Sequence, residues 1–229
     1  MPEIRPRRSM LYMPGSNARA IEKARSIDAD AIILDLEDAV APEAKVEARG
    51  RIVASLEAGG FGPREMAVRI NGLDTPWGAD DLAAVVKAKP AAILLPKVQS
   101  RAEILRASEA MTRAGAGADM QLWGMMETPV AILKAAEIAA AGAADGSRLK
   151  LLLMGTNDLI KDTRAEMTAD RTAAMYWLQA CLTAARAYGL DVLDGVYNNF
   201  KDAEGYKREC VHGRALGFDG KTLIHPDQV

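Results

Sequence analysis

The stretch AIILDLEDAV, residues 31–40, decides the fold of this chain. Four apolar residues lead into Asp35, Glu37 and Asp38, which is typical of a buried parallel strand that delivers polar groups at its C-terminal end. Four later stretches have the same form, an apolar run that reaches one charged residue: MAVRIN with Arg69, AAILLPKV with Lys97, MQLWGMMETP with Glu127 and LKLLLMGTNDL with Asp158. Five such strand ends predict one shared charged site, which favours an enzyme.

Strand patterns and helical patterns alternate along the whole chain. Eight strands are expected at residues 9–15, 30–37, 65–71, 91–98, 120–127, 149–156, 190–196 and 220–226, and seven helices at residues 17–27, 41–59, 74–89, 100–115, 128–142, 173–189 and 204–217. Strict alternation predicts an all-parallel sheet, and eight strands close a (β/α)8 TIM barrel. We expect one domain over residues 1–229, with no eighth helix after the last strand.

Composition excludes several classes of protein. The 229 residues are 49% hydrophobic and 26% charged with a net charge of -2, which implies neither a nucleic-acid partner nor an anionic membrane. No run of 18 apolar residues and no secretory signal pattern is present. Two cysteines and two histidines make a zinc framework improbable and favour a reducing, cytoplasmic setting. The three arginines of the first ten residues are expected to form a solvated arm.

Glu127 and Asp158 are the candidate metal ligands. Alternation along the fifth and sixth strands would place both at the mouth of the barrel, with Leu152 and Met154 on the same inward face as Asp158. Each acid alone could equally be a helix cap or an ion-pair partner. Two carboxylates without a nearby histidine or cysteine favour Mg²⁺, which leaves its other positions to water and substrate.

Arg69 is the candidate binder of a substrate carboxylate. Its planar fork can hold a 2-oxo acid whose keto and carboxylate oxygens reach the metal. The alternative role is a structural ion pair with Asp35 or Glu37, and the two roles are compatible. Lys97 is expected to balance charge among the acids rather than to form a Schiff base.

The turn Gly15–Ser16 follows the first strand and precedes a helix. Backbone N–H groups and the helix dipole at such a turn suit a phosphate group. The same residues are also ordinary turn and cap residues, so the pattern alone does not decide.

These motifs together resemble the HpcH/HpaI aldolase and citrate lyase β-subunit family. The resemblance rests on RSMLYMPGSNARAIEKA, AIILDLEDAVAPEAKVEAR, AVRIN, ILLPKV, MMETP, GTNDL, DGVYNNFKD and GFDGKTLIHPDQV, which occur in order. It implies a barrel of the phosphoenolpyruvate/pyruvate-domain type with Mg²⁺ on Glu127 and Asp158. Arg69 would bind the oxo acid, Glu37 and Asp38 would line the pocket, and the loop with Gly15 and Ser16 would approach the thioester's nucleotide.

The implied reaction is cleavage of a carbon–carbon bond in a 3-hydroxyacyl thioester. Products would be a 2-oxo acid and an acetyl thioester, carried by CoA or an acyl-carrier protein, in a homo-oligomer such as a trimer or hexamer. The alternatives are an aldolase for free 4-hydroxy-2-oxo acids and a non-catalytic subunit that binds an oxo acid. Two departures from the family pattern are Asn157 before Asp158, with Lys161 nearby, and the absence of a C-terminal lid segment.

Overall fold

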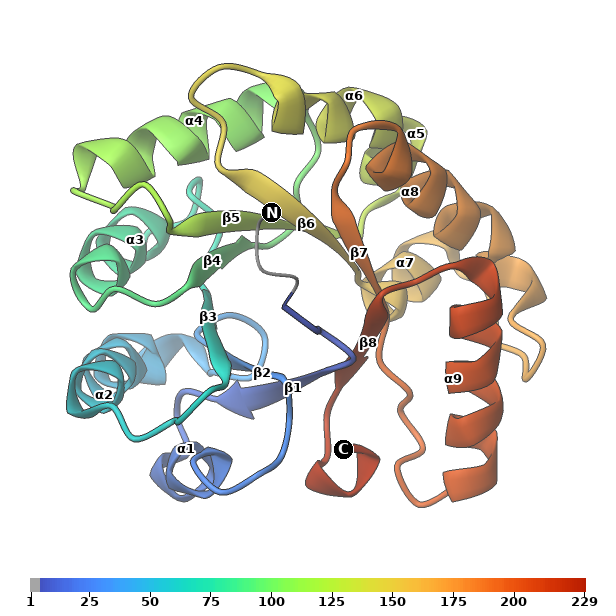
Figure 1. The fold of residues 1–229 in the computed structure, drawn as a ribbon, viewed down its shortest axis with the longest axis horizontal. Coiled ribbons are helices and arrows are strands. Elements are labelled where there is room, and N and C mark those ends of the chain that lie inside the picture. The colour runs from blue at the N-terminus through green and yellow to red at the C-terminus, as the bar shows by residue number, and fades with distance from the viewer. Residues whose placement is uncertain (1–4) are drawn as a thin grey trace.

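A computed structural model describes residues 5–229, which form a closed barrel of parallel strands enclosed by helices (Figure 1). The strands pair in chain order, and β1 pairs with β8 to close the ring. Their bounds are β1 Ser9–Pro14, β2 Ala31–Asp35, β3 Glu65–Arg69, β4 Ala92–Leu95, β5 Gln121–Met126, β6 Leu149–Met154, β7 Asp191–Asp194 and β8 Gly220–Leu223. The predicted (β/α)8 barrel is confirmed.

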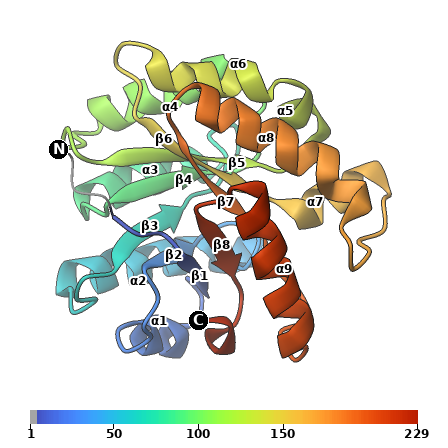
Figure 2. The ribbon, with the colours of Figure 1, turned by 45° about the vertical axis from the view of Figure 1, so that its right-hand side comes forward.

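Helices cover the outside of the barrel, and most run back alongside the strand that precedes them (Figures 1 and 2). The α-helices are α1 Ala18–Ala24, α2 Lys45–Ala58, α3 Gly78–Lys87, α4 Arg101–Arg113, α5 Pro129–Leu133, α6 Ala135–Ala140, α7 Thr156–Thr163, α8 Met175–Ala187 and α9 Ala203–Leu216. Short 3₁₀ helices are η1 Pro42–Ala44, η2 Ala141–Ala143, η3 Thr172–Ala174 and η4 Pro226–Gln228, the last of which follows β8.

Apolar side chains form two layers, one inside the ring of strands and one between strands and helices. The inner layer consists of Met10, Ala31, Ile33, Ala67, Ala92, Leu94, Trp123, Met125, Leu151, Leu153 and Leu193. All of them are buried, so the barrel interior is a packed core rather than a channel. A ligand can therefore reach the strands only at an end of the barrel.

The inward face of the sixth strand differs from the prediction. Leu151 and Leu153 point into the barrel, whereas Leu152 and Met154 belong to the outer layer. A register shift on β5, between Leu122 and Trp123, accompanies this pairing. The run LKLLLM is apolar on both faces, as expected for a strand buried on both sides, and so its pattern cannot reveal which residues face inward.

The helices also differ from the prediction in two places. Residues 156–163, where the sequence predicts no helix, form α7, which ends at Arg164 in the left-handed conformation with φ 59°. The helix expected at residues 128–142 is split into α5 and α6 at Lys134, where ψ is 17° rather than helical. Because α7 begins directly after β6, it places its first turn at the mouth of the barrel.

Arg7 closes the opposite end of the barrel, so the expectation of a solvated N-terminal arm is wrong for this residue. Its Nε donates to Glu65 Oε2 at 2.6 Å, and its guanidinium also pairs with Asp191. Gln121 accepts a further hydrogen bond at 3.1 Å, and the guanidinium lies 5.4 Å from the centre of the Trp123 ring. Arg7 thus fills the floor of the barrel under the inner apolar layer.

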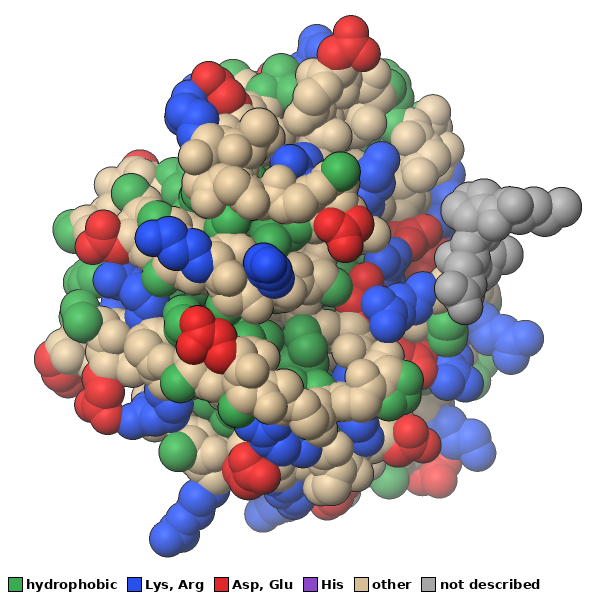
Figure 3. Space-filling view, turned by 60° about the vertical axis from the view of Figure 1, so that its left-hand side comes forward, with side chains coloured by type: hydrophobic (Ala, Val, Ile, Leu, Met, Phe, Trp, Pro, Cys, Tyr) green, Lys and Arg blue, Asp and Glu red, His purple; other side chains and the backbone are tan. Residues whose placement is uncertain are grey.

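Basic and acidic side chains are interspersed on the surface shown in Figure 3, without a large patch of one sign. Among residues 5–229, none of the helices has the length and apolar character needed to span a lipid bilayer. Cys181 is buried, Cys210 is half-buried, and both are free thiols.

Candidate active site

A cavity of about 360 Å³ opens at the C-terminal ends of the strands. Its lining residues are Tyr12, Pro14, Asp35, Asp38, Ala39, Arg69, Met125, Glu127, Met154, Gly155, Thr156, Asn157, Asp158, Val196 and Ile224. The lining has a charged side, built from β2, β3, β5 and α7, and an apolar side of methionine, valine and isoleucine. All three predicted catalytic residues, Arg69, Glu127 and Asp158, therefore meet in one cavity.

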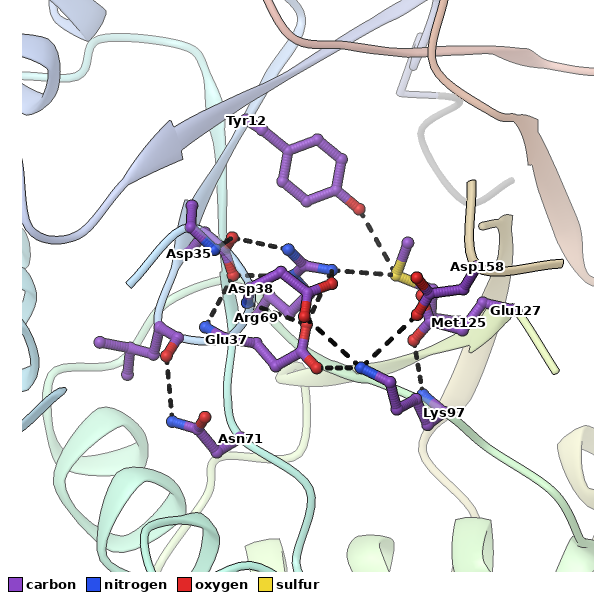
Figure 4. Close-up of polar contacts among 12 residues, drawn as sticks. Tyr12, Asp35, Glu37, Asp38, Arg69, Asn71, Lys97, Met125, Glu127 and Asp158 are labelled. Atoms are coloured by element: carbon purple, nitrogen blue, oxygen red, sulfur yellow. Dashed lines mark hydrogen bonds and ion pairs between the residues drawn. The ribbon is translucent and has the colours of Figure 1, made fainter. Parts of the chain in front are cut away.

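Arg69 is held in place by Asp35 (Figure 4). The two residues stand opposite each other at the ends of β3 and β2. Arg69 Nε donates to Asp35 Oδ1 at 2.7 Å and Nη2 to Oδ2 at 2.6 Å, which is the bidentate arrangement. Burial alone would lower the pKa of Arg69, but the adjacent Asp35 charge raises it well above its ordinary value. The guanidinium is thus always charged and has a fixed orientation.

The remaining edge of Arg69 is buried but directed at the mouth of the barrel. Nη1 lies 3.1 Å from Glu37 Oε2 and 3.6 Å from Asp38 Oδ2, and it donates to Met125 Sδ at 3.7 Å. The Tyr12 ring packs against the guanidinium, with 5.1 Å between its centre and Cζ. The structural ion pair considered for Arg69 is therefore present with Asp35, while Nη1 remains directed at the cavity.

Glu37 and Asp38 form an acidic rim beside that edge. Burial raises the pKa of Glu37, although Arg69 and Lys97 oppose the shift. For Asp38 burial also acts to raise the pKa, but the hydrogen bond with Glu37 and the charges of Arg69 and Lys97 leave it lowered. Asp38 is consequently a permanent acceptor that is 56% exposed, where it can hold water or substrate hydroxyl groups.

Glu127 follows β5 and is almost completely buried, with 1% exposed. The amide N–H of Lys97 donates to its Oε1 at 2.7 Å. Burial raises the pKa of Glu127 from an ordinary 4.5 to about 7, against the lowering effects of Arg69 and that hydrogen bond. Gly155 is required here, because a Cβ at that position would lie 2.3 Å from Glu127 Cβ. A buried carboxyl without a full counter-charge is suited to a cation.

Asp158 lies in the first turn of α7, so the structure places it at the mouth by a helix rather than on the sixth strand. Its side chain is 29% exposed, and Lys97 Nζ lies 3.6 Å from Oδ2. Residues 5–229 contain no group of three or more His, Cys, Asp or Glu arranged to enclose a metal. Two carboxylates on one cavity nevertheless suit Mg²⁺, which usually keeps waters or substrate in its other positions.

The Gly15–Ser16 turn lies beside the cavity, because Pro14 is one of the lining residues. The amide of Gly15 donates to Asp35 O at 2.8 Å, so it is not free for a phosphate as the sequence suggested. A Cβ on Gly15 would lie 2.7 Å from that oxygen, which explains the glycine. Ser16 is exposed, and Arg51 donates to the carbonyl oxygens of both residues, which adds a cation that the sequence reasoning missed.

Several other residues that line the cavity were not among the predicted site residues. Tyr12 and Met125 are inward-facing residues in ordinary apolar strands, and only their position near a strand end distinguishes them. Asn157 lines the cavity and exchanges two hydrogen bonds with Asn198, of 3.2 and 2.7 Å. Lys161 is exposed on α7 and is not one of the lining residues.

Residues 8–226 match the family described as HpcH/HpaI aldolase/citrate lyase, which covers nearly the whole barrel. The chain belongs to this family. Two relatives at different distances are the (3S)-malyl-CoA thioesterase of Cereibacter sphaeroides and the citrate lyase β-subunit of Escherichia coli. The first is 52% identical and the second 34%, and each alignment spans 99% of this chain and 76% of the relative.

Solved structures of the citrate lyase β-subunit of Mycobacterium tuberculosis have the same fold. The structure with oxaloacetate and magnesium has a TM-score of 0.81 and 31% identity, and covers 98% of this chain and 94% of its own. Another, with magnesium, acetoacetate and coenzyme A, has a TM-score of 0.81, 30% identity and coverages of 98% and 78%. The family and the barrel fold are therefore those predicted, and magnesium is the ion bound in these solved structures of related proteins.

Proposed function

We propose that the enzyme cleaves a carbon–carbon bond in the acyl group of a CoA thioester. The acyl group is that of a short 3-hydroxydicarboxylic acid, and malyl-CoA is the first candidate substrate. The observation that carries this proposal is the Nη1 edge of Arg69, which Asp35 does not hold and which lies beside the acidic rim in the same cavity as Glu127 and Asp158. A carboxylate on that edge would present the neighbouring hydroxyl group toward the two acids. CoA enters the proposal because related structures bind it with magnesium and an oxo acid.

Glu127 and Asp158 would hold the metal, and Glu37 and Asp38 would hold water and orient Arg69. When bound, Mg²⁺ supplies positive charge near the substrate oxygen that loses its proton. During cleavage the hydroxyl proton leaves, and the bond between the hydroxyl-bearing carbon and the methylene carbon breaks. The electron pair passes to the thioester enolate, which is then protonated to the acetyl thioester. The fixed Arg69 keeps the departing oxo acid oriented throughout this step.

The apolar side of the cavity favours a small acyl group. Met125, Val196 and Ile224 line it, while Arg69 is the only arginine or lysine among the described lining residues. A citryl group would bring an additional carboxylate, and the cation at the mouth besides Arg69 is Lys97, which already pairs with Glu37; burial of a charge without its own partner is costly. We therefore expect malyl-CoA and citramalyl-CoA to be better substrates than citryl-CoA.

Hydrolysis of malyl-CoA is a second candidate activity, favoured by the 52% identical relative that is named a (3S)-malyl-CoA thioesterase. Water would then add to the thioester carbonyl, the carbon–sulfur bond would break, and CoA would leave as the thiol. Binding of the acid through Arg69 is the same in both reactions. The two reactions differ in the bond of malyl-CoA that breaks, which is the carbon–carbon bond in one and the carbon–sulfur bond in the other.

Product analysis separates the two activities. Each of the three thioesters is incubated with the enzyme in Mg²⁺ or EDTA, and 2-oxo acid, acetyl-CoA and free thiol are quantified. Carbon–carbon cleavage gives glyoxylate and acetyl-CoA from malyl-CoA without free thiol, whereas hydrolysis gives malate and thiol. Asp158→Asn should lose turnover while Asp162→Asn, an exposed neighbour on α7, should keep it. Turnover that persists in EDTA would contradict the metal assignment.

Assembly and cellular setting complete the proposal. We expect a homo-oligomer, either a trimer or a hexamer, which light scattering of the purified protein would measure. Two free thiols are compatible with the expected cytoplasmic setting.

A further inference from the structure

Lys97 contacts both proposed metal ligands, one through its backbone and the other through its side chain (Figure 4). Its amide donates to Glu127 Oε1 at 2.7 Å, and its Nζ lies 3.6 Å from Asp158 Oδ2. The same ammonium pairs with Glu37 and lies 3.6 Å from Asp38 Oδ1. Within residues 5–229, no other lysine or arginine lies within ion-pair distance of Asp158. One residue thus connects every acid of the site except Asp35.

The backbone of Lys97 is left-handed, with φ 50°. This conformation is unfavourable for a residue with a Cβ and natural for glycine. Strained residues of this kind concentrate at functional sites, where the surrounding structure holds them. Here Glu127 holds the amide and Glu37 holds the ammonium, so the side chain has a use that glycine could not provide.

The ammonium and Mg²⁺ must compete for Asp158. A bound divalent ion would repel a lysine that is already in contact with the same carboxylate. Lys97 cannot withdraw far, because its amide remains bonded to Glu127 and its Nζ to Glu37. Even with the dielectric constant of water, a unit charge about 5 Å from a divalent ion weakens the binding of that ion roughly tenfold or more.

We propose that Lys97 is a built-in competitor of the metal: it neutralises Asp158 in the metal-free enzyme and weakens Mg²⁺ binding until an anionic oxo acid joins the site. The carboxylate of the oxo acid offsets the lysine charge, so that metal and acid bind cooperatively. This inference rests on the proposed assignment of Glu127 and Asp158 as ligands. Lys97 is a positioning residue in this scheme, since it acts through the acids it contacts.

Calorimetric titration of the metal-free enzyme with Mg²⁺, and then of the Mg²⁺-loaded enzyme with pyruvate, tests the proposal. Lys97→Met should bind Mg²⁺ roughly tenfold or more tightly than wild type and bind pyruvate more weakly. Lys97→Gly should behave in the same way, because it keeps the amide to Glu127 and loses only the ammonium. Lys97→Arg should restore the wild-type affinities to within about threefold, since it keeps the charge.

Lys89 provides a matched control. It is an exposed lysine with φ 53°, and it precedes the N-terminal end of β4, at the opposite end of the strand from Lys97. Lys89→Met should leave both affinities unchanged. Unchanged or weaker Mg²⁺ binding in Lys97→Met would overturn the inference, because a merely structural lysine would loosen both ligands. Glu127→Gln identifies a different failure: if that variant binds Mg²⁺ like wild type, the proposed metal site itself is wrong.

Discussion

Replacement of Glu127 by glutamine should stabilise the metal-free enzyme at alkaline pH while it abolishes Mg²⁺ binding. The carboxyl is buried, and burial raises its pKa from 4.5 to about 7. Between these values the folded protein binds more protons than the unfolded chain, so the free energy of unfolding falls as the pH rises through this window. Above about pH 8 the full cost of burying the ionised carboxylate is present. Glutamine carries no charge and therefore avoids this cost.

The size of the effect follows from the shift. A change of about 2.5 pKa units corresponds to about 3 kcal/mol at 1.36 kcal/mol per unit. Glutamine keeps an oxygen that can accept from the Lys97 amide, so that hydrogen bond is preserved. For a chain of this length, 1 kcal/mol moves Tm by about 2–4 °C, which predicts a rise of roughly 6–12 °C at pH 8. At pH 5 the difference should be below about 1 kcal/mol.

Thermal and urea unfolding of both proteins in EDTA, at pH 5 and pH 8, measures this difference. Addition of Mg²⁺ should stabilise wild type and leave Glu127→Gln unchanged. Glu57→Gln, on the exposed face of α2, is the control and should match wild type within about 0.5 kcal/mol. A Glu127→Gln variant that is less stable than wild type at pH 8 would refute the reasoning, because the ionised Glu127 would then stabilise the metal-free fold rather than destabilise it.

Three other substitutions test separate parts of the structure. Arg69→Lys should lower kcat/KM roughly a hundredfold or more, because lysine cannot pair with Asp35 through one edge and bind substrate through the other. Steady-state kinetics measures this, and a loss below tenfold would contradict the role of Arg69 in binding the substrate carboxylate. Asp158→Asn should weaken Mg²⁺ binding by roughly tenfold or more in a calorimetric titration, with Tm unchanged because the side chain is partly exposed. Arg7→Met should cost about 3 kcal/mol or more in urea unfolding, since buried Glu65 is left with the exposed Arg5 at 4.0 Å, yet leave Mg²⁺ affinity unchanged. A lower Mg²⁺ affinity would mean that the floor of the barrel affects its mouth.

Much of the barrel could be predicted because its strands are short apolar runs that end in charges. Arg69, Glu127 and Asp158 follow three such runs, and parallel strands deliver their ends to the same face. Their convergence was therefore visible without coordinates. The family resemblance supplied the chemistry proposed for those strand ends.

The parts that sequence could not predict depend on packing between distant segments. Arg7 resembles a solvated residue until Glu65 and Asp191 are seen to surround it. Lys97 resembled a lone charge, and its contact with both proposed metal ligands depends on a left-handed backbone that lysine rarely adopts. Such contacts are set by the closure of the barrel and leave no periodic pattern in the chain.

The most direct measurement is anomalous diffraction from crystals in which Mn²⁺ replaces Mg²⁺, grown with pyruvate. The central claim is that Glu127 and Asp158 hold the metal and that Arg69 holds the acid. It predicts one manganese peak in contact with a carboxylate oxygen of each ligand, and pyruvate with its carboxylate on Arg69 Nη1. A peak at Glu37 and Asp38 instead, or no peak at the mouth, would contradict it.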